Sequence, residues 1–108
     1  MHSIIIMGVE RIIDQALTHL IRGQLTGEHD LGNAAILFGQ ALSAEPNNVL
    51  ALEGKGRAFL YAGRYNEALA ELERSLSLGN EDHRLRRDIG IALTRLGRHD
   101  EALTHLNL

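Results

Sequence analysis

Six histidines are the residues of this sequence best suited to binding a metal ion or transferring protons near neutral pH. They are His2, His19, His29, His83, His99 and His105. No two of them are four residues apart, the spacing that places both imidazoles of a zinc site on one face of a helix. Glu101 and His105 form the single acid–imidazole pair at that spacing. The pattern therefore favours structural histidines, and we expect neither a metal site nor an acid–base pair.

Other kinds of catalytic residue are equally poorly represented. The chain has no cysteine, which excludes thiolate catalysis, a thiolate zinc site and a disulfide framework. Gly54, Lys55 and Gly56 resemble part of a phosphate-binding loop, but the rest of that motif is absent. No serine lies in a nucleophile-elbow sequence. We therefore expect a protein that is not an enzyme and that has no cofactor.

The charges also restrict the class of partner. The 108 residues include 11 basic and 14 acidic side chains, for a net charge of −3, which is too balanced for general nucleic-acid binding. Residues 1–54 carry two arginines against six acids, whereas residues 55–108 carry nine basic residues against eight acids. No apolar run approaches the roughly 20 residues of a membrane span, and no signal peptide is recognisable. We expect a cytoplasmic protein that binds neither nucleic acid nor a membrane.

These side chains are positioned by an internal repeat of 34 residues. Three segments align without a gap, and the third ends before its period is complete: 15–48, 49–82 and 83–108. Ala34, Ala68 and Ala102 occupy the same position in all three. Residues 62–69 and 96–103 match best, because they share Gly-Arg, a ring-bearing side chain and Glu-Ala-Leu in register. The chain is therefore predicted to contain one repeat domain, with residues 1–14 as an upstream extension of its first helix.

Each copy is predicted to form two helices. Apolar residues recur three and four apart, which is typical of helices and not of strands. Gly63 and Gly97 separate paired apolar runs, where a left-handed residue can end a helix. Pro46, followed by Asn48, ends one helix and supplies a capping amide for the next. The expected helices span residues 9–27, 31–44, 48–62, 65–78, 82–96 and 99–108.

The repeat resembles the tetratricopeptide repeat in both its length and its pattern of residue types. The middle copy resembles it most closely, with Gly56, Phe59, Gly63, Tyr65 and Ala68 at the family's positions. This resemblance covers residues 15–108 and implies an all-α, right-handed superhelical array of antiparallel helix pairs. The sequence departs from the family pattern at four positions: Arg22, His29, Ser75 and Asn80.

The resemblance also implies a function, which is to bind a partner protein or peptide in a concave groove lined by the first helix of each pair. From the first copy it places in the groove Ala16, His19, Leu20, Gly23, Thr26 and Gly27. From the other copies we expect partner contacts from Leu50, Arg57, Leu60, Tyr61, Arg84, Arg87, Ile91 and Arg95. Arg57, Arg84 and Arg87 favour an acidic peptide, because guanidinium groups bind carboxylates in pairs of hydrogen bonds. The family's clamp for chaperone C-termini is not expected, since only Arg84 keeps the required chemistry.

Apolar residues near both ends predict a second kind of contact. The residues concerned are Ile5, Val9, Ile12, Leu103, Leu106 and Leu108. Repeat stacks need a polar outer face at each end, so these residues predict either a homodimer or flanking helices of a longer protein. The favoured reading is a non-catalytic binding module. The alternatives are a homo-oligomerising structural module and a regulatory fragment of a larger protein or enzyme.

Overall fold

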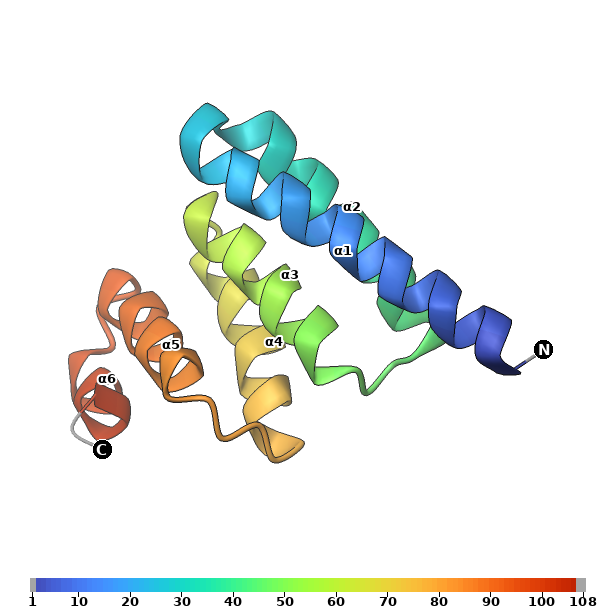
Figure 1. Ribbon diagram of the computed structural model, residues 1–108. Helices are drawn as coiled ribbons and strands as arrows, with labels where there is room; N and C mark the ends of the chain where they lie inside the picture. Colours follow the sequence, from blue (N-terminus) through green and yellow to red (C-terminus); the bar gives the residue numbers. More distant parts are fainter. Residues whose placement is uncertain (1, 107–108) are drawn as a thin grey trace.

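The computed structural model describes the backbone of residues 2–106 and the side chains of residues 8–106. It contains six helices in three consecutive pairs: α1 (His2–Thr26), α2 (Glu28–Ala44), α3 (Val49–Tyr61), α4 (Tyr65–Ser77), α5 (His83–Arg95) and α6 (His99–Leu106). The pairs stack along the molecule in chain order (Figure 1), within extents of 47 × 31 × 17 Å. The all-α array of helix pairs that the repeat predicts is confirmed.

Polar caps and left-handed glycines fix the ends of the later helices. Asn48 accepts a hydrogen bond from the Ala51 amide at 3.0 Å and begins α3, while Asp82 does the same for α5. Gly63 and Gly97 have φ values of +78° and +79°. At these angles the chain reverses without a steric penalty, because glycine has no Cβ. The turn roles predicted for both glycines are confirmed.

The first pair departs from the expected turn. Gly27, with a φ of +97°, is the single residue between α1 and α2, so α2 begins at Glu28 and not at residue 31. His29, which aligns with the turn glycines of the later copies, therefore lies inside α2. The turn comes two residues earlier than the repeat alignment predicts, and α1 is correspondingly rotated relative to its equivalents.

Asp30 joins the two helices on either side of this early turn. Its carboxylate accepts a hydrogen bond from the Thr26 hydroxyl at 2.6 Å and lies 2.9 Å from Nδ1 of His19. Arg22 is further away, at 3.8 Å. The hydroxyl of Thr26, then the imidazole of His19, hold the pKa of Asp30 below its ordinary value of 3.8. Thr26 and His19 on α1 thus hold Asp30 on α2 beside the early turn.

Replacing Asp30 with asparagine is expected to lower the melting temperature most at neutral pH. A carboxylate whose pKa is lowered by folding stabilises the protein above its ordinary pKa, and this contribution is lost as the pH falls through the lower, folded value. The difference between the wild type and Asp30→Asn should therefore shrink below about pH 4. Thermal unfolding followed by circular dichroism at each pH measures this difference in melting temperature. A difference independent of pH would show that the charge of Asp30 does not stabilise the turn.

Close helix packing depends on glycines facing leucines. A Cβ placed on Gly56 would lie 2.6 Å from the side chain of Leu72, and one on Gly90 would lie 2.6 Å from that of Leu106. These distances are far below van der Waals contact, so α3 and α5 approach their partner helices only because the side chain is missing. In the first pair Gly23 on α1 allows the same close approach, because it faces Leu31 on α2. A glycine that faces a leucine is therefore present in each pair.

Candidate protein-binding surfaces

The array curves toward the first helix of each pair. In the described part of the chain, α3 contacts both α1 and α5, whereas α4 contacts neither α2 nor α6. The first helices are therefore closer together than the second helices, and Figure 1 shows α1, α3 and α5 next to one another in that order. We call the exposed face that these three helices share the concave surface. This surface is the equivalent of the groove expected from the sequence.

The part of the concave surface between α1 and α3 exposes large apolar side chains beside a cleft that Glu10, Asp14 and Glu45 also line. Leu50 on α3 is 64% exposed and lines a cleft of about 350 Å³ together with Leu17 on α1. Ile21, one turn beyond Leu17, is also exposed. Tyr61 lies at the far end of α3, on the helix face that carries Leu50, and is 42% exposed. This arrangement offers several large apolar side chains to a partner without any change in the fold.

A buried ionic cluster separates this apolar part from α5. Arg57 donates from Nε to Asp88 at 2.7 Å and from Nη2 to Glu53. The side chains are 17%, 4% and 6% exposed respectively, so the guanidinium is already occupied by two carboxylates of the protein itself. The expectation that Arg57 contributes a free cation to the groove is wrong, because α5 places Asp88 against it.

Two of the departures from the family pattern belong to the same cluster. Asn80 donates hydrogen bonds to Glu53 at 3.1 Å and to the hydroxyl of Ser75 at 2.9 Å. Ser75 in turn donates to the carbonyl of Val49 at 3.3 Å. These bonds connect α3, α4 and the loop before α5. The joint occurrence of Ser75 and Asn80 in one copy was the signal in the sequence that could have indicated such a network.

The α5 part of the concave surface is cationic. Arg84, Ile91 and Arg95 are exposed there, and they occupy the positions that Leu50, Arg57 and Tyr61 occupy on α3. The backbone amide and then the guanidinium of Arg84 donate to Asp82 and lower the pKa of that carboxyl. Arg84 is still 60% exposed, so it keeps donors available to a ligand.

The remaining expected groove residues lie elsewhere. Leu60 is buried in the core formed by α3 to α6, and Arg87 lies at the end of the stack, next to α6. From the first copy, Ala16, Leu20 and Gly23 are buried between α1 and its neighbours. Leu17 and Ile21 are the large apolar side chains that α1 exposes in their place.

The expected self-association residues are only partly exposed. Val9 is buried in the core formed mainly by α1 and α2, and Ile12 is partly buried against the same core. Leu103 and Leu106 on α6 are exposed, although Leu106 also packs against Gly90. Ile5 and Leu108 lie outside the residues whose side chains are described.

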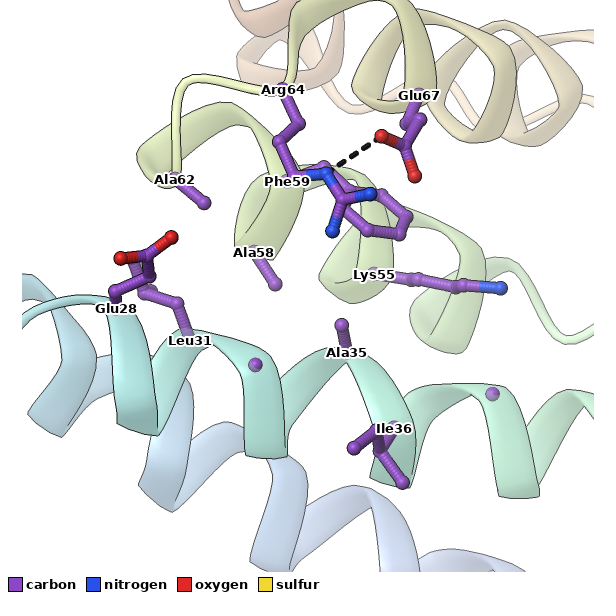
Figure 2. Close-up of a pocket in the computed structure, with 12 residues that line it drawn as sticks. Glu28, Leu31, Ala35, Ile36, Lys55, Ala58, Phe59, Ala62, Arg64 and Glu67 are labelled. Carbon is purple, nitrogen blue, oxygen red and sulfur yellow. Dashed lines mark hydrogen bonds and ion pairs between the residues drawn. The ribbon is translucent and has the colours of Figure 1, made fainter.

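A second cleft lies on the other side of α3, between α2 and the start of α4 (Figure 2). Its volume is about 510 Å³, and Ile36 and Phe59 are its largest apolar side chains. The guanidinium of Arg64 lies 5.4 Å from the centre of the Phe59 ring and donates to Glu67 at 2.7 Å. Lys55 lies 5.9 Å from the same ring. Lys55, Arg64 and Glu67 thus each contact an opposite charge, and apart from Glu28 the rest of the lining is apolar or glycine.

Within residues 8–106, no three histidine or acidic side chains gather closely enough to hold a metal ion. None of the helices in residues 2–106 has both the length and the hydrophobicity that crossing a membrane requires.

Stacked antiparallel helix pairs that curve around a concave surface define a helical repeat protein. The sequence profile of the tetratricopeptide repeat matches residues 27–76 and 54–108. The chain belongs to the tetratricopeptide repeat family, whose repeats generally act as protein-interaction modules and are typically non-catalytic. No curated protein shows a significant match to the chain.

Proposed function

We infer that the protein binds a segment of a partner polypeptide along its concave surface and does not catalyse a reaction. The observation that carries this proposal is the set of large apolar side chains exposed between α1 and α3, beside the buried ionic cluster around Arg57. Leu17 and Leu50 line one cleft, so a single apolar side chain of a partner could contact both. Apolar side chains that become buried on binding contribute to affinity roughly in proportion to the apolar area removed from water.

The exposed groups further along the surface indicate the chemistry of the partner. Apolar residues of a bound segment would meet Leu17, Ile21 and Leu50, while an acidic residue would pair with Arg84 or Arg95 on α5. The ionic cluster around Arg57 lies between these two regions and is already neutralised in part by its own contacts. We therefore expect a segment with apolar residues at one end and an acidic residue at the other.

Replacing Leu17 and Leu50 together with serine is expected to weaken partner binding at least about tenfold, because each leucine buries apolar area on binding. Peptides selected from a random library on the wild-type protein would serve as ligands, and fluorescence anisotropy would measure their affinity. Ile36→Ser is the matched control, since Ile36 is equally exposed but lies on the opposite side of α3. Circular dichroism would verify that both variants keep their helix content.

Two outcomes would contradict the proposal. Selected peptides that bind Leu17→Ser/Leu50→Ser as tightly as the wild type would show that the concave surface is not the site. Loss of binding in Ile36→Ser alone would place the site in the cleft of Figure 2 instead.

Self-association is a second proposal, and its support is narrower. It rests on Leu103 and Leu106, the described members of the expected self-association set that are exposed. If they drive assembly, the wild type should sediment as a dimer and Leu103→Ser/Leu106→Ser as a monomer. A wild-type chain that stays monomeric at high concentration would dismiss it.

A further inference from the structure

The end of the stack carries a basic cluster that forms no part of the apolar binding surface. His83, Arg86, Arg87 and His105 line a cavity of about 280 Å³ together with Leu106. No acidic side chain lines this cavity. On the concave surface, by contrast, Arg57 and Arg84 each contact a carboxylate. We call the five residues the basic end face.

The polar groups of the basic end face are not used within the described part of the chain. Neither Arg86 nor Arg87 forms an ion pair with any residue between 8 and 106. His105 is half-buried, and its Nδ1 is buried without a hydrogen-bond partner. The acid nearest in sequence to His105 on α6, Glu101, accepts hydrogen bonds from Arg98 at 3.0 and 2.6 Å.

The preceding copy of the repeat has a different chemistry at the same positions. Arg86 and Arg87 are equivalent to Leu52 and Glu53, which lie 34 residues earlier and are both buried. Glu53 faces the third pair, where it joins the ionic cluster with Arg57. The position through which Glu53 contacts the loop before α5 thus carries Arg87 in the third copy, without an ion pair to any residue between 8 and 106. Two guanidinium groups and two imidazoles surround the one cavity there.

We propose that the basic end face binds the carboxylates of an acidic segment of a partner polypeptide. Guanidinium groups bind carboxylates through paired hydrogen bonds, and the two imidazoles supply further donors when protonated. Leu106 gives the cavity an apolar wall for the methylene groups of a glutamate. A nucleic acid fits less well, because its affinity depends on many phosphate contacts in a row and the chain has a net charge of −3.

The test measures binding of a fluorescein-labelled peptide of alternating glutamate and aspartate, with its glutamine and asparagine counterpart as the neutral control. The wild type should bind the acidic peptide and not the neutral one, and binding should weaken as salt is added. Arg86→Gln/Arg87→Gln should weaken it at least about tenfold. Arg11→Gln/Arg22→Gln is the matched control, because it removes the same charge from exposed positions on α1 and should have no effect.

Nuclear magnetic resonance then locates the bound peptide. The largest shifts should fall on His83, Arg86, Arg87 and His105, and they should persist in Leu17→Ser/Leu50→Ser, which keeps the end face intact. Equal affinity in Arg86→Gln/Arg87→Gln, or shifts confined to Arg84 and Arg95, would overturn the proposal. It would also be overturned if a single-stranded oligonucleotide bound more tightly than the peptide. Self-association of the wild type that Arg86→Gln/Arg87→Gln abolishes would overturn it as well, since the occupant would then be a second copy of the chain.

Discussion

Arg57→Met is expected to destabilise the protein by about 3 kcal/mol, more than any other loss of a single ion pair in the described residues. The substitution removes the guanidinium that both Glu53 and Asp88 contact, while methionine fills a similar volume. Two almost fully buried carboxylates would be left without their cation. The cost comes mainly from those stranded charges and less from the attraction that is lost. Urea unfolding followed by circular dichroism gives the free energy of unfolding directly.

Arg98→Met is the matched control for this experiment. Arg98 also contacts a carboxylate closely, that of Glu101, but both side chains are about half exposed, so the loss should stay below about 1 kcal/mol. Adding Glu53→Gln and Asp88→Asn to Arg57→Met should recover part of the stability, since no buried charge then remains in this cluster. If Arg57→Met costs no more than Arg98→Met, the cluster is not a structural centre of the fold.

Gly54→Ala is expected to destabilise the protein by about 1–3 kcal/mol, although alanine usually favours a helix. The ring of Phe38 on α2 lies directly against the missing Cβ of Gly54 on α3, so a methyl group there would overlap the ring. The first two helix pairs would have to separate to admit it. The free energy of unfolding again measures the effect.

Gly32→Ala is the matched control for Gly54→Ala. Gly32 is also helical, but a Cβ placed on it meets nothing within 4 Å, so alanine should stabilise the protein by about 0.5–1 kcal/mol. Phe38→Leu combined with Gly54→Ala should cost less than the sum of the two single changes, because the smaller side chain makes room. A stabilising Gly54→Ala would contradict the close approach of α2 and α3.

The period of 34 residues was enough to predict the helix pairs and the turns at Gly63 and Gly97, because helix periodicity and glycine conformation are local properties. The early turn at Gly27 could not be read in the same way. Residues 26–30 include no apolar side chain, so the apolar spacing predicts a turn within this stretch but does not show which residue makes it. The choice between Gly27 and His29 depends on contacts that form only in three dimensions, such as those of Asp30.

The same distinction between local properties and tertiary contacts applies to the concave surface. Exposure of Leu50, Tyr61, Arg84 and Arg95 follows from their repeat positions, which predict the face of a helix. The ion pair of Arg57 with Asp88 does not follow from repeat position. Asp88 is 31 residues away in the sequence and contacts Arg57 only because α5 packs on α3. Repeat position therefore predicts where a side chain points, and tertiary packing decides whether its charge remains available.

The uneven distribution of charge along the stack has a consequence for the speed of association. The first half of the chain has four more acids than basic residues, whereas the second half has one more basic residue than acids and includes the basic end face. The molecule therefore carries an electric dipole along its long direction. An approaching polypeptide with negative charge is rotated toward the α5–α6 end before any contact forms, which raises the rate of productive encounters at low ionic strength.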